Sequence, residues 1–405
     1  MRNIPQPAEF AASAVNELHK VILSFWLERC IDNERGGFFG EVSPEGVPVP
    51  TAEKGAVLNA RILWTFSAAA RLYPDRVEYR KAADRAYDYF TKYFVDKGFG
   101  GTFWSVDCDG NMLDGKKQTY AQGFSMYGLA EYFALTGNKA ALDMAMQIFD
   151  HVEAKAYEPT HGGYWEARSR DWQPMADIRL SARDMNVPKS FNTSLHVLEA
   201  YMRLMEVAPC EKIRKALEGT VRIHTDHIYN AKTGHLELFF DVDWKSLSTV
   251  VSYGHDIEAV WLIDRAARLC GNADLIATVE KMNIHVADVT LAEGIDADGG
   301  IYYEGYPDKG TIDRDRHWWP QVEAALGFLC VWKQTGEEKY YNAAWGTWNY
   351  GVSNLRNKEI GEWYFRVSNE GEPYREIPMA SFWKCPYHGG RACMEIAARL
   401  GKGTP

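Results

Sequence analysis

Two kinds of helical pattern alternate along the chain. In the first kind, apolar residues lie three and four positions apart with charged residues between them, which predicts a surface helix with one buried stripe. Segments of this kind span residues 10–29, 77–94, 138–155, 210–229, 272–291 and 337–356. The second kind is apolar on most sides, which predicts an inner helix. Segments of this kind span residues 54–72, 118–135, 190–206, 255–270, 318–334 and 386–400.

A glycine next to aromatic residues recurs six times, once for each pair of helices. These glycines are Gly37, Gly101, Gly163, Gly234, Gly300 and Gly361, at steps of 61 to 71 residues. They lie in the longer connections, where such segments predict short strands or hairpins. The other connections are short and contain Gly137, Gly271 or Gly336, which is typical of helical hairpins. A fixed period of this size indicates a repeat architecture.

The repeat predicts an all-α fold, an (α/α)6 barrel of six helix pairs with short β-hairpins in the long connections. A length of 405 residues alone would favour two or three domains, but six stacked helix pairs can close into one ring with a shared core. We therefore expect a single catalytic domain over residues 1–405. All long connections then lie where the inner helices begin, so polar residues in the first turns of these helices converge at that end.

Composition and charge exclude several classes of partner. The net charge of −10 argues against binding to nucleic acid or to anionic membranes, and no apolar run is long enough to span a bilayer. The N-terminal residues lack the apolar stretch of a secretory signal, and the seven cysteines form no CxxC pair. These features favour a cytoplasmic protein with reduced thiols and no metal site. The 14 Trp and 22 Tyr residues favour a carbohydrate ligand, because aromatic faces stack on sugar rings.

Three histidines, His196, His255 and His388, occupy equivalent positions near the starts of different inner helices. A single histidine on an apolar helix is more often a core residue than a catalyst, but three at matching positions favour function. His255 and Glu258 lie three residues apart, so we expect the carboxylate to orient the imidazole, although such a pair could also serve rigidity alone. Arg61 stays protonated, and would hold an oxyanion or pair with a carboxylate.

The remaining candidates in these first turns are polar or aromatic. Trp319 and Trp383 lie where loops enter helices, where they could fill the core or stack on a sugar. Tyr120, Asn192 and Glu323 complete the set.

Four motifs, in order along the chain, resemble the N-acylglucosamine 2-epimerase superfamily and, within it, the cellobiose 2-epimerase group. They are KSFNT (189–193) followed by His196, GHDIEA (254–259), WWPQVEA (318–324) and FWKCPYH (382–388). The resemblance covers essentially the whole chain. Phe191 and Ser194 stand where members of the family often have Met and His, a departure that concerns local packing only.

The resemblance implies a reversible, cofactor-free inversion at C2 of the reducing-end sugar of a β-1,4-linked disaccharide. Cellobiose would become glucosyl-mannose, and lactose would become epilactose. It makes His255 and His388 the acid–base pair, assisted in catalysis by His196, Glu258 and Arg61. The sugar-binding residues that we expect are Tyr120, Asp184, Asn192, Trp319, Glu323 and Trp383.

The residue types are consistent with this chemistry. A hydrogen on C2 becomes acidic only after the ring opens, because the aldehyde then accepts the charge as an enediolate. Inversion needs proton transfer on both faces of C2, and imidazole, with an ordinary pKa of about 6.5, suits both roles near neutral pH. Each such group contributes roughly 10²- to 10⁴-fold to the rate. We therefore expect the rate to fall on the acid side of the range from about pH 5 to about pH 8.

Three other readings stay open. The same histidines would suit a mannose 2-epimerase or an aldose–ketose isomerase that acts on free monosaccharides. A glycoside hydrolase would need two carboxylates across the scissile bond, for which Glu258, Glu323 and Asp184 are candidates. A non-catalytic sugar-binding module is the third. For the epimerase we expect a small-molecule sugar as the partner and a monomer or weak dimer.

Overall fold

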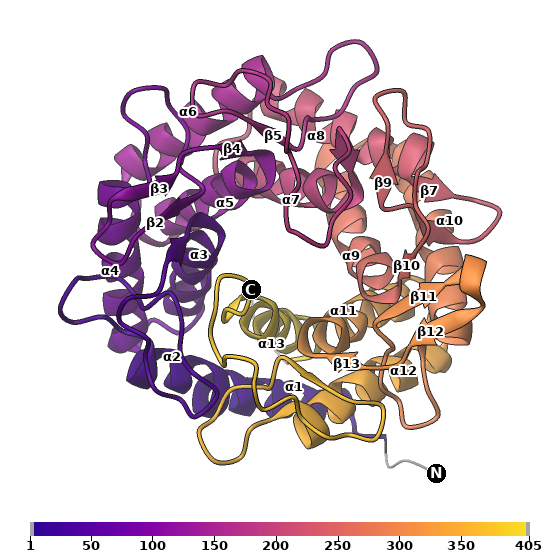
Figure 1. The fold of residues 1–405 in the computed structure, drawn as a ribbon. Coiled ribbons are helices and arrows are strands. Elements are labelled where there is room, and N and C mark those ends of the chain that lie inside the picture. Colours follow the sequence, from indigo (N-terminus) through magenta and orange to yellow (C-terminus); the bar gives the residue numbers. More distant parts are fainter. Residues whose placement is uncertain (1–3, 402–405) are drawn as a thin grey trace.

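The computed structural model describes residues 4–401 and contains two concentric rings of helices (Figure 1). The inner ring consists of α3 (Ala56–Leu72), α5 (Thr119–Thr136), α7 (Phe191–Val207), α9 (Tyr253–Cys270), α11 (Trp318–Thr335) and α13 (Tyr387–Leu400). The outer ring consists of α1 (Pro7–Glu17) with α2 (Leu23–Arg29), α4 (Val77–Tyr93), α6 (Lys139–Lys155), α8 (Glu211–Ile223), α10 (Ala273–Val289) and α12 (Glu338–Tyr350). The predicted (α/α)6 barrel is confirmed.

Burial explains why the two sets of helices occupy different rings. Helix α3 is buried at every position from Ala56 to Ala70, whereas α4 buries a single stripe. Inner helices approach each other closely where glycine removes a side chain, since a Cβ atom on Gly128 of α5 would lie 2.7 Å from the carbonyl oxygen of Ala60 in α3. None of the helices between residues 4 and 401 has the length and apolar composition needed to cross a bilayer.

The short connections between inner and outer helices have the expected glycine turns. Gly137, Gly271 and Gly336 end α5, α9 and α11 with φ angles of 69°, 71° and 74°, a left-handed conformation that favours glycine. Four outer helices also contain a π-helical turn that the sequence pattern did not indicate. These turns are η1 (Leu18–Ile22), η2 (His224–Ile228), η3 (Thr290–Gly294) and η5 (Gly351–Leu355).

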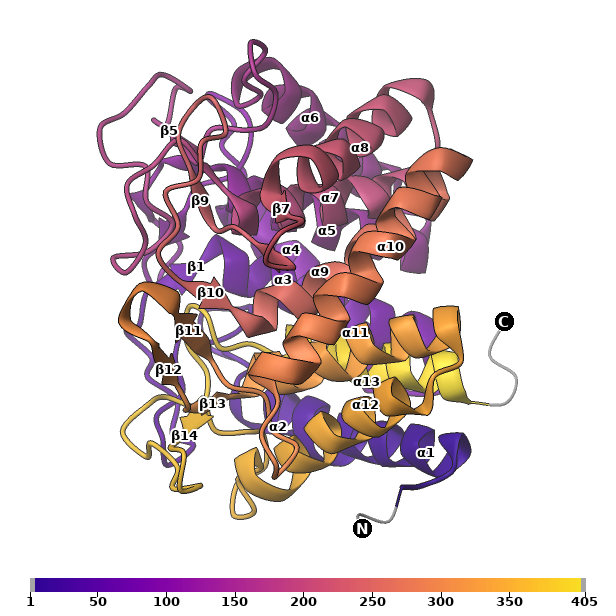
Figure 2. The same ribbon diagram turned by 90° about the vertical axis from the view of Figure 1, so that its right-hand side faces the viewer.

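Short antiparallel strands in the long connections gather at one end of the barrel, on the left in Figure 2. Strands that precede inner helices pair with a strand of the following module: β1 (Lys54–Gly55) with β2 (Ser105–Val106), β4 (Lys117–Gln118) with β5 (Ala167–Arg168), β6 (Lys189–Ser190) with β9 (Phe239–Phe240), β10 (Val251–Ser252) with β11 (Glu304–Tyr306), and β13 (Arg316–His317) with β14 (Arg366–Val367). Three further strands, β3 (Met112–Asp114), β7 (Tyr229–Asn230) and β12 (Thr311–Asp313), pair with β2, β8 (His235–Leu236) and β11. A bridge between Val42 and Ala380 joins the first connection to the last. The start of each inner helix is therefore tied to a neighbouring module.

An ion pair with a buried base also ties the glycine–aromatic segment of five modules to the start of an inner helix. The base lies two or three residues before the helix and its side chain is fully buried. The pairs are Lys54–Asp32 (3.1 Å), Lys117–Asp96 (2.8 Å), Lys189–Glu158 (3.2 Å), Arg316–Asp296 (2.7 Å) and Lys384–Glu362 (2.7 Å). Breaking such a pair leaves an uncompensated buried charge, so the pairs hold the first turns of the inner helices in place.

Candidate active site

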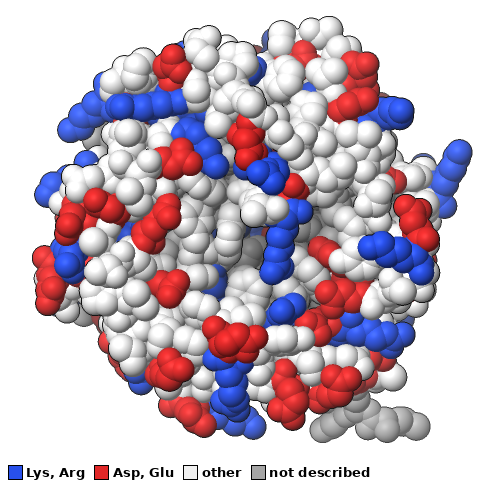
Figure 3. All heavy atoms as spheres, in the orientation of Figure 1, with Lys and Arg blue, Asp and Glu red and all other residues white. Residues whose placement is uncertain are grey.

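A cavity of about 900 Å³ opens at the barrel end that carries the long connections, and Figure 3 shows the hollow at the centre of this face. Its walls include the first turns of the inner helices. Ten of the eleven predicted site residues line it: Arg61, Tyr120, Asp184, Asn192, His196, His255, Glu258, Trp319, Trp383 and His388. The eleventh, Glu323, contacts His388 from outside the cavity lining.

His255 lies in the first turn of α9, where its Nδ1 atom is 2.8 Å from Oγ of Ser252. The expected pairing of His255 with Glu258 is wrong, because Glu258 accepts a hydrogen bond from Arg391 (2.8 Å) instead. A spacing of three places two side chains on one helical face without deciding their partners, and Ser252, three residues before His255, takes the imidazole. Burial lowers the pKa of His255 to about 3, and His196 adds to this shift.

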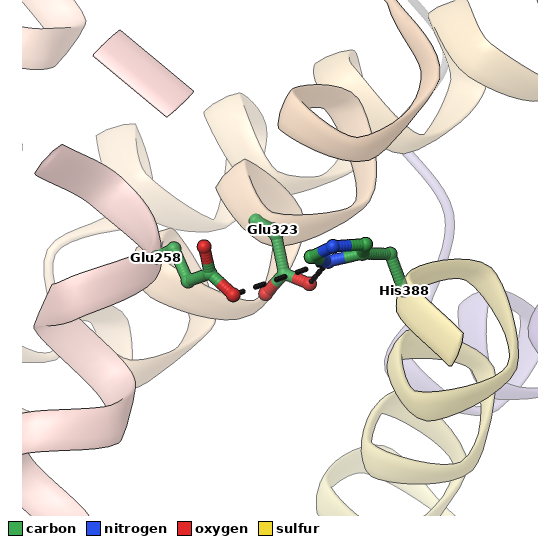
Figure 4. A group of neighbouring side chains, drawn as sticks. All are labelled: Glu258, Glu323 and His388. Carbon is green, nitrogen blue, oxygen red and sulfur yellow. Dashed lines mark hydrogen bonds and ion pairs between the residues drawn. The ribbon is translucent and has the colours of Figure 1, made fainter. Parts of the chain in front are cut away.

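His388 lies in the first turn of α13 and pairs with Glu323 of α11 (Figure 4), with 2.7 Å between Nδ1 and Oε1. The Oε1 atom of Glu258 is 3.9 Å from the same nitrogen. An ionised carboxylate only accepts hydrogen bonds, so this contact places the hydrogen of a neutral imidazole on Nδ1 and leaves Nε2 as an acceptor. Burial lowers the pKa of His388 well below its ordinary value, and the charges of Arg61 and Arg391 add to the shift.

Trp319 connects the two imidazoles. Its ring centroid lies 4.6 Å from that of His255 and 5.7 Å from that of His388. The sum of these distances is the upper limit for the separation of the two imidazole centroids. Both rings can therefore reach one sugar bound in the cavity.

Arg61 lies on the cavity wall beside the third histidine. Its Nη2 atom donates a hydrogen bond to the hydroxyl of Tyr120 (2.6 Å), whose ring is 5.0 Å from that of His196. The Nδ1 atom of His196 is 2.9 Å from Oε2 of Glu199. A phenol partner, unlike a carboxylate, leaves the charge of Arg61 available to an anion in the cavity.

Arg391 of α13 was not predicted from the sequence. Its guanidinium binds three carboxyl groups. Nη2 donates to Oε1 of Glu258 (2.8 Å) and of Glu323 (2.7 Å), and Nη1 donates to Glu199. Burial, together with repulsion by Glu323, raises the pKa of Glu258 to about 8, and burial raises that of Glu323. Since the pKa of about 8 belongs to Glu258, we place the proton that this pair retains near neutral pH on Glu258 and treat Glu323 as ionised. For Glu199, Arg391 and His196 outweigh burial and lower the pKa.

Glu258, Glu323 and His388 place three potential metal-ligand atoms within 4.8 Å of one another. The same Oε1 atoms of both glutamates bind Arg391, which supplies the positive charge that a metal would bring. That the protein has no metal site stays a prediction.

The other predicted residues complete the lining of the cavity. Trp383 packs against Tyr120 and Trp104, with ring centroids 6.1 and 6.0 Å apart. Asp184 lies in the loop before β6, where its carboxylate accepts the backbone N–H of Ser181 (2.8 Å). An aromatic wall beside acidic and amide side chains suits a ligand with both apolar faces and hydroxyl groups.

Sequence reasoning missed Glu199, Arg391 and Ser252. Glu199 and Arg391 lie three residues after His196 and His388, the same spacing as Glu258 after His255. A comparison of all three histidine helices would have shown this shared spacing. Ser252 is the N-cap residue of α9, a position where a hydroxyl is normally assigned to the helix backbone.

Comparisons with known proteins identify the family of the chain. The profile of the family described as N-acylglucosamine 2-epimerase (GlcNAc 2-epimerase) matches residues 37–388. A cellobiose 2-epimerase of Bacteroides fragilis is 42% identical over 380 residues, which cover 94% of this chain and 96% of the relative. The structure of a cellobiose 2-epimerase from Bacillus thermoamylovorans matches with a TM-score of 0.92 at 36% identity, covering 96% of this chain and 99% of that one.

A D-mannose isomerase of Marinomonas mediterranea is more distant, at 24% identity over 403 residues, covering 93% of this chain and 95% of the relative. The family profile and the 42% identity each extend over most of the chain. The chain therefore belongs to the N-acylglucosamine 2-epimerase family.

Proposed function

We propose that this protein is a carbohydrate 2-epimerase that interconverts glucose and mannose at the reducing end of β-1,4-linked disaccharides such as cellobiose and lactose. The observation that carries the proposal is the position of His255 and His388, which line one cavity and both pack on Trp319. The 42% identity to the cellobiose 2-epimerase of Bacteroides fragilis supports this choice of substrate.

The reaction needs an open-chain aldose. One imidazole removes the C2 hydrogen as a proton, and the electron pair of the C–H bond passes into an enediolate with its charge on the C1 oxygen. The other imidazole must carry a second proton for this step, taken up from solvent and favoured by the negative charge of the enediolate. It gives this proton to the opposite face of C2 and ends neutral, and the two groups recover their starting protonation through solvent. Burial favours the neutral form of both imidazoles, so either can act as a base near neutral pH.

The hydrogen-bond partners distinguish the two imidazoles. Glu323 can only accept from Nδ1 of His388, which fixes the lone pair of that ring on Nε2. The hydroxyl of Ser252 can donate to or accept from Nδ1 of His255, so that ring can present either a lone pair or an N–H group. We assign His388 as the base and His255 as the donor in one direction, with the roles exchanged in the other.

Arg61 and Tyr120 would stabilise the negative charge that develops on the C1 oxygen. Arg61 is only 3% exposed, and a charge acts more strongly in such a site than in water. Groups that are in place before the reaction lower the barrier without a cost for reorganisation. His196, held by Glu199, adds a further polar group beside Tyr120.

The size of the cavity favours a disaccharide over a monosaccharide. Its volume of about 900 Å³ is near the upper end of the roughly 300–1,000 Å³ that ligand pockets span. Trp319 and Trp383 offer aromatic faces for sugar rings, and Asp184 lines the same cavity, where it would accept a hydrogen bond from a hydroxyl of the second ring.

The positions of Glu258 and Glu323 count against their acting as the carboxyl pair of a glycoside hydrolase. That reaction needs two carboxyl groups on opposite sides of a glycosidic bond. Glu258 and Glu323 instead bind the same nitrogen of Arg391, and Glu323 does not line the cavity.

Incubation with cellobiose, lactose, mannose and glucose in D₂O, followed by NMR, tests the proposal. We expect cellobiose to give glucosyl-mannose with deuterium at C2 of both product and recovered substrate. Release of glucose would indicate hydrolysis, and a ketose would indicate an isomerase. Conversion without deuterium at C2 would indicate a hydride shift and refute the two-histidine mechanism.

The setting of the enzyme is part of the proposal. We expect a cytoplasmic enzyme that is a monomer or a weak dimer. Size-exclusion chromatography with light scattering at several concentrations tests the second point, since a stable higher oligomer would contradict it.

A further inference from the structure

A single buried arginine links the histidine partners on three inner helices. Arg391, on α13, is 1% exposed and donates to Glu199 of α7, Glu258 of α9 and Glu323 of α11. It does not line the cavity, so it has no part in binding the sugar.

Two of these three carboxylates also contact an imidazole. Glu199 holds Nδ1 of His196 at 2.9 Å, and Glu323 holds Nδ1 of His388 at 2.7 Å. The same chain of contacts, guanidinium to carboxylate to imidazole, therefore occurs twice around Arg391. His255 is outside this arrangement, because its Nδ1 atom contacts the hydroxyl of Ser252.

We propose that Arg391 is a positioning residue for proton transfer: it keeps Glu199 and Glu323 ionised, and thereby fixes the hydrogen of His196 and of His388 on Nδ1. The inference rests on the proposed epimerase function and adds a residue to its machinery. It also predicts different behaviour for the two reacting imidazoles, because the position of the ring hydrogen depends on Arg391 in His388 but not in His255.

The physical reason is the balance of charge in a buried cluster. Three carboxyl groups around one guanidinium already carry an excess of negative charge. Without the guanidinium, burial favours protonation of Glu323. A protonated Glu323 would donate to Nδ1 of His388, which moves the hydrogen of that ring to Nε2. The ring could then no longer accept a proton from C2, so kcat falls while KM changes little.

Arg265 provides a matched control. It lies on α9 and binds Glu206 of α7 (2.9 Å) and Glu395 of α13 (3.0 Å), so it joins three inner helices through carboxylates as Arg391 does. Neither carboxylate contacts a histidine that lines the cavity. Arg265→Met therefore measures the effect of losing an interhelical arginine on stability alone.

The experiment compares Arg391→Met, Arg391→Lys and Arg265→Met by thermal unfolding, by steady-state kinetics with cellobiose and by deuterium incorporation in D₂O. For Arg391→Met we expect kcat to fall roughly 100-fold or more with KM within about twofold. The epimer whose C2 hydrogen faces His255 should still take up deuterium without inversion. Arg265→Met should keep kcat and the exchange of both epimers.

Arg391→Lys keeps a charge but has one nitrogen where two are needed, so we expect an intermediate kcat. If Arg391→Met does not fold, the kcat of Arg391→Lys tests the proposal in its place. Guanidinium ion, below denaturing concentrations, should restore part of the activity of Arg391→Ala. A folded Arg391→Met enzyme with wild-type kcat, or with equal loss of exchange in both epimers, would overturn the inference. Failure of the wild-type enzyme to incorporate deuterium would instead overturn the proposed function.

Discussion

The acid side of the pH profile offers a direct test of the buried histidines. Burial lowers the pKa of His255 from 6.5 to about 3, because its partner, the hydroxyl of Ser252, carries no charge to stabilise an imidazolium. Glu323 acts in the opposite direction, but His196 and burial outweigh it. The pKa of His388 is also lowered, first by burial and then by Arg61 and Arg391. Both imidazoles are therefore neutral throughout the physiological range.

The size of the effect follows from the two pKa values. A histidine with a pKa of about 6.5 is only about 3% neutral at pH 5, so kcat/KM would fall about 30-fold from its plateau. With a pKa of about 3, as for His255, roughly 99% of the imidazole is still neutral at pH 5. The structure thus predicts that kcat/KM falls only below about pH 5, whereas the sequence alone predicted a fall above about pH 5.

The assay is the initial rate of epimer formation at low cellobiose concentration and constant ionic strength, with circular dichroism at each pH. The folded-state pKa of His255 is depressed, so its contribution to stability is present above pH 6.5 and is lost as the pH falls toward 3. Loss of activity below about pH 5 should therefore accompany loss of structure. An acid limb with a pKa near 6.5 in a folded enzyme would refute this reasoning.

Other parts of the structure give further predictions. Trp383→Ala should raise KM for cellobiose about tenfold with little change in kcat, and an unchanged KM would contradict its assignment to sugar binding. Arg61→Lys should lower kcat roughly 100-fold with the fold intact, since an ammonium cannot replace the planar guanidinium at Tyr120; retained kcat would exclude its role at the oxyanion. Lys54→Met should cost roughly 3 kcal/mol in urea unfolding because it leaves the buried carboxylate of Asp32 without its cation, and adding Asp32→Asn should recover much of this loss; no recovery would contradict the role of the pair. The raised pKa of Glu258 means that its contribution is present below pH 4.5 and lost as the pH rises through about 8, so Tm should fall less from about pH 6 to about pH 9 in Glu258→Gln than in the wild type.

The fold could be predicted because each of its signals is local. The stripe of α4 and the continuous apolar character of α3 are visible within single segments, and the left-handed glycines Gly137, Gly271 and Gly336 mark the helix ends. The π-helical turns could not be predicted, because they keep the helical spacing of apolar residues to within one position.

The site divides into a part that is local and a part that is not. The convergence of His196, His255 and His388 follows from their equivalent places in a ring of helices. Their partners do not follow, because the contact of His388 with Glu323 spans 65 positions and that of Arg391 with Glu199 spans 192. The one spacing that was used, His255 to Glu258, describes a real face of the helix but not a contact, since the arginine of another helix takes the carboxylate.

The fourth module shows how one structural link can be built from different residues. Val251 occupies the position of the buried base, and Asn230 that of the acid. Asp256, in the first turn of α9, instead accepts the backbone N–H of Leu236 (2.8 Å) and contacts Nδ1 of His235 (2.8 Å). The acid is now on the helix and the base in the glycine–aromatic segment, so the link is kept with its charges reversed. A search for a lysine or arginine before each inner helix would therefore miss the module that carries His255.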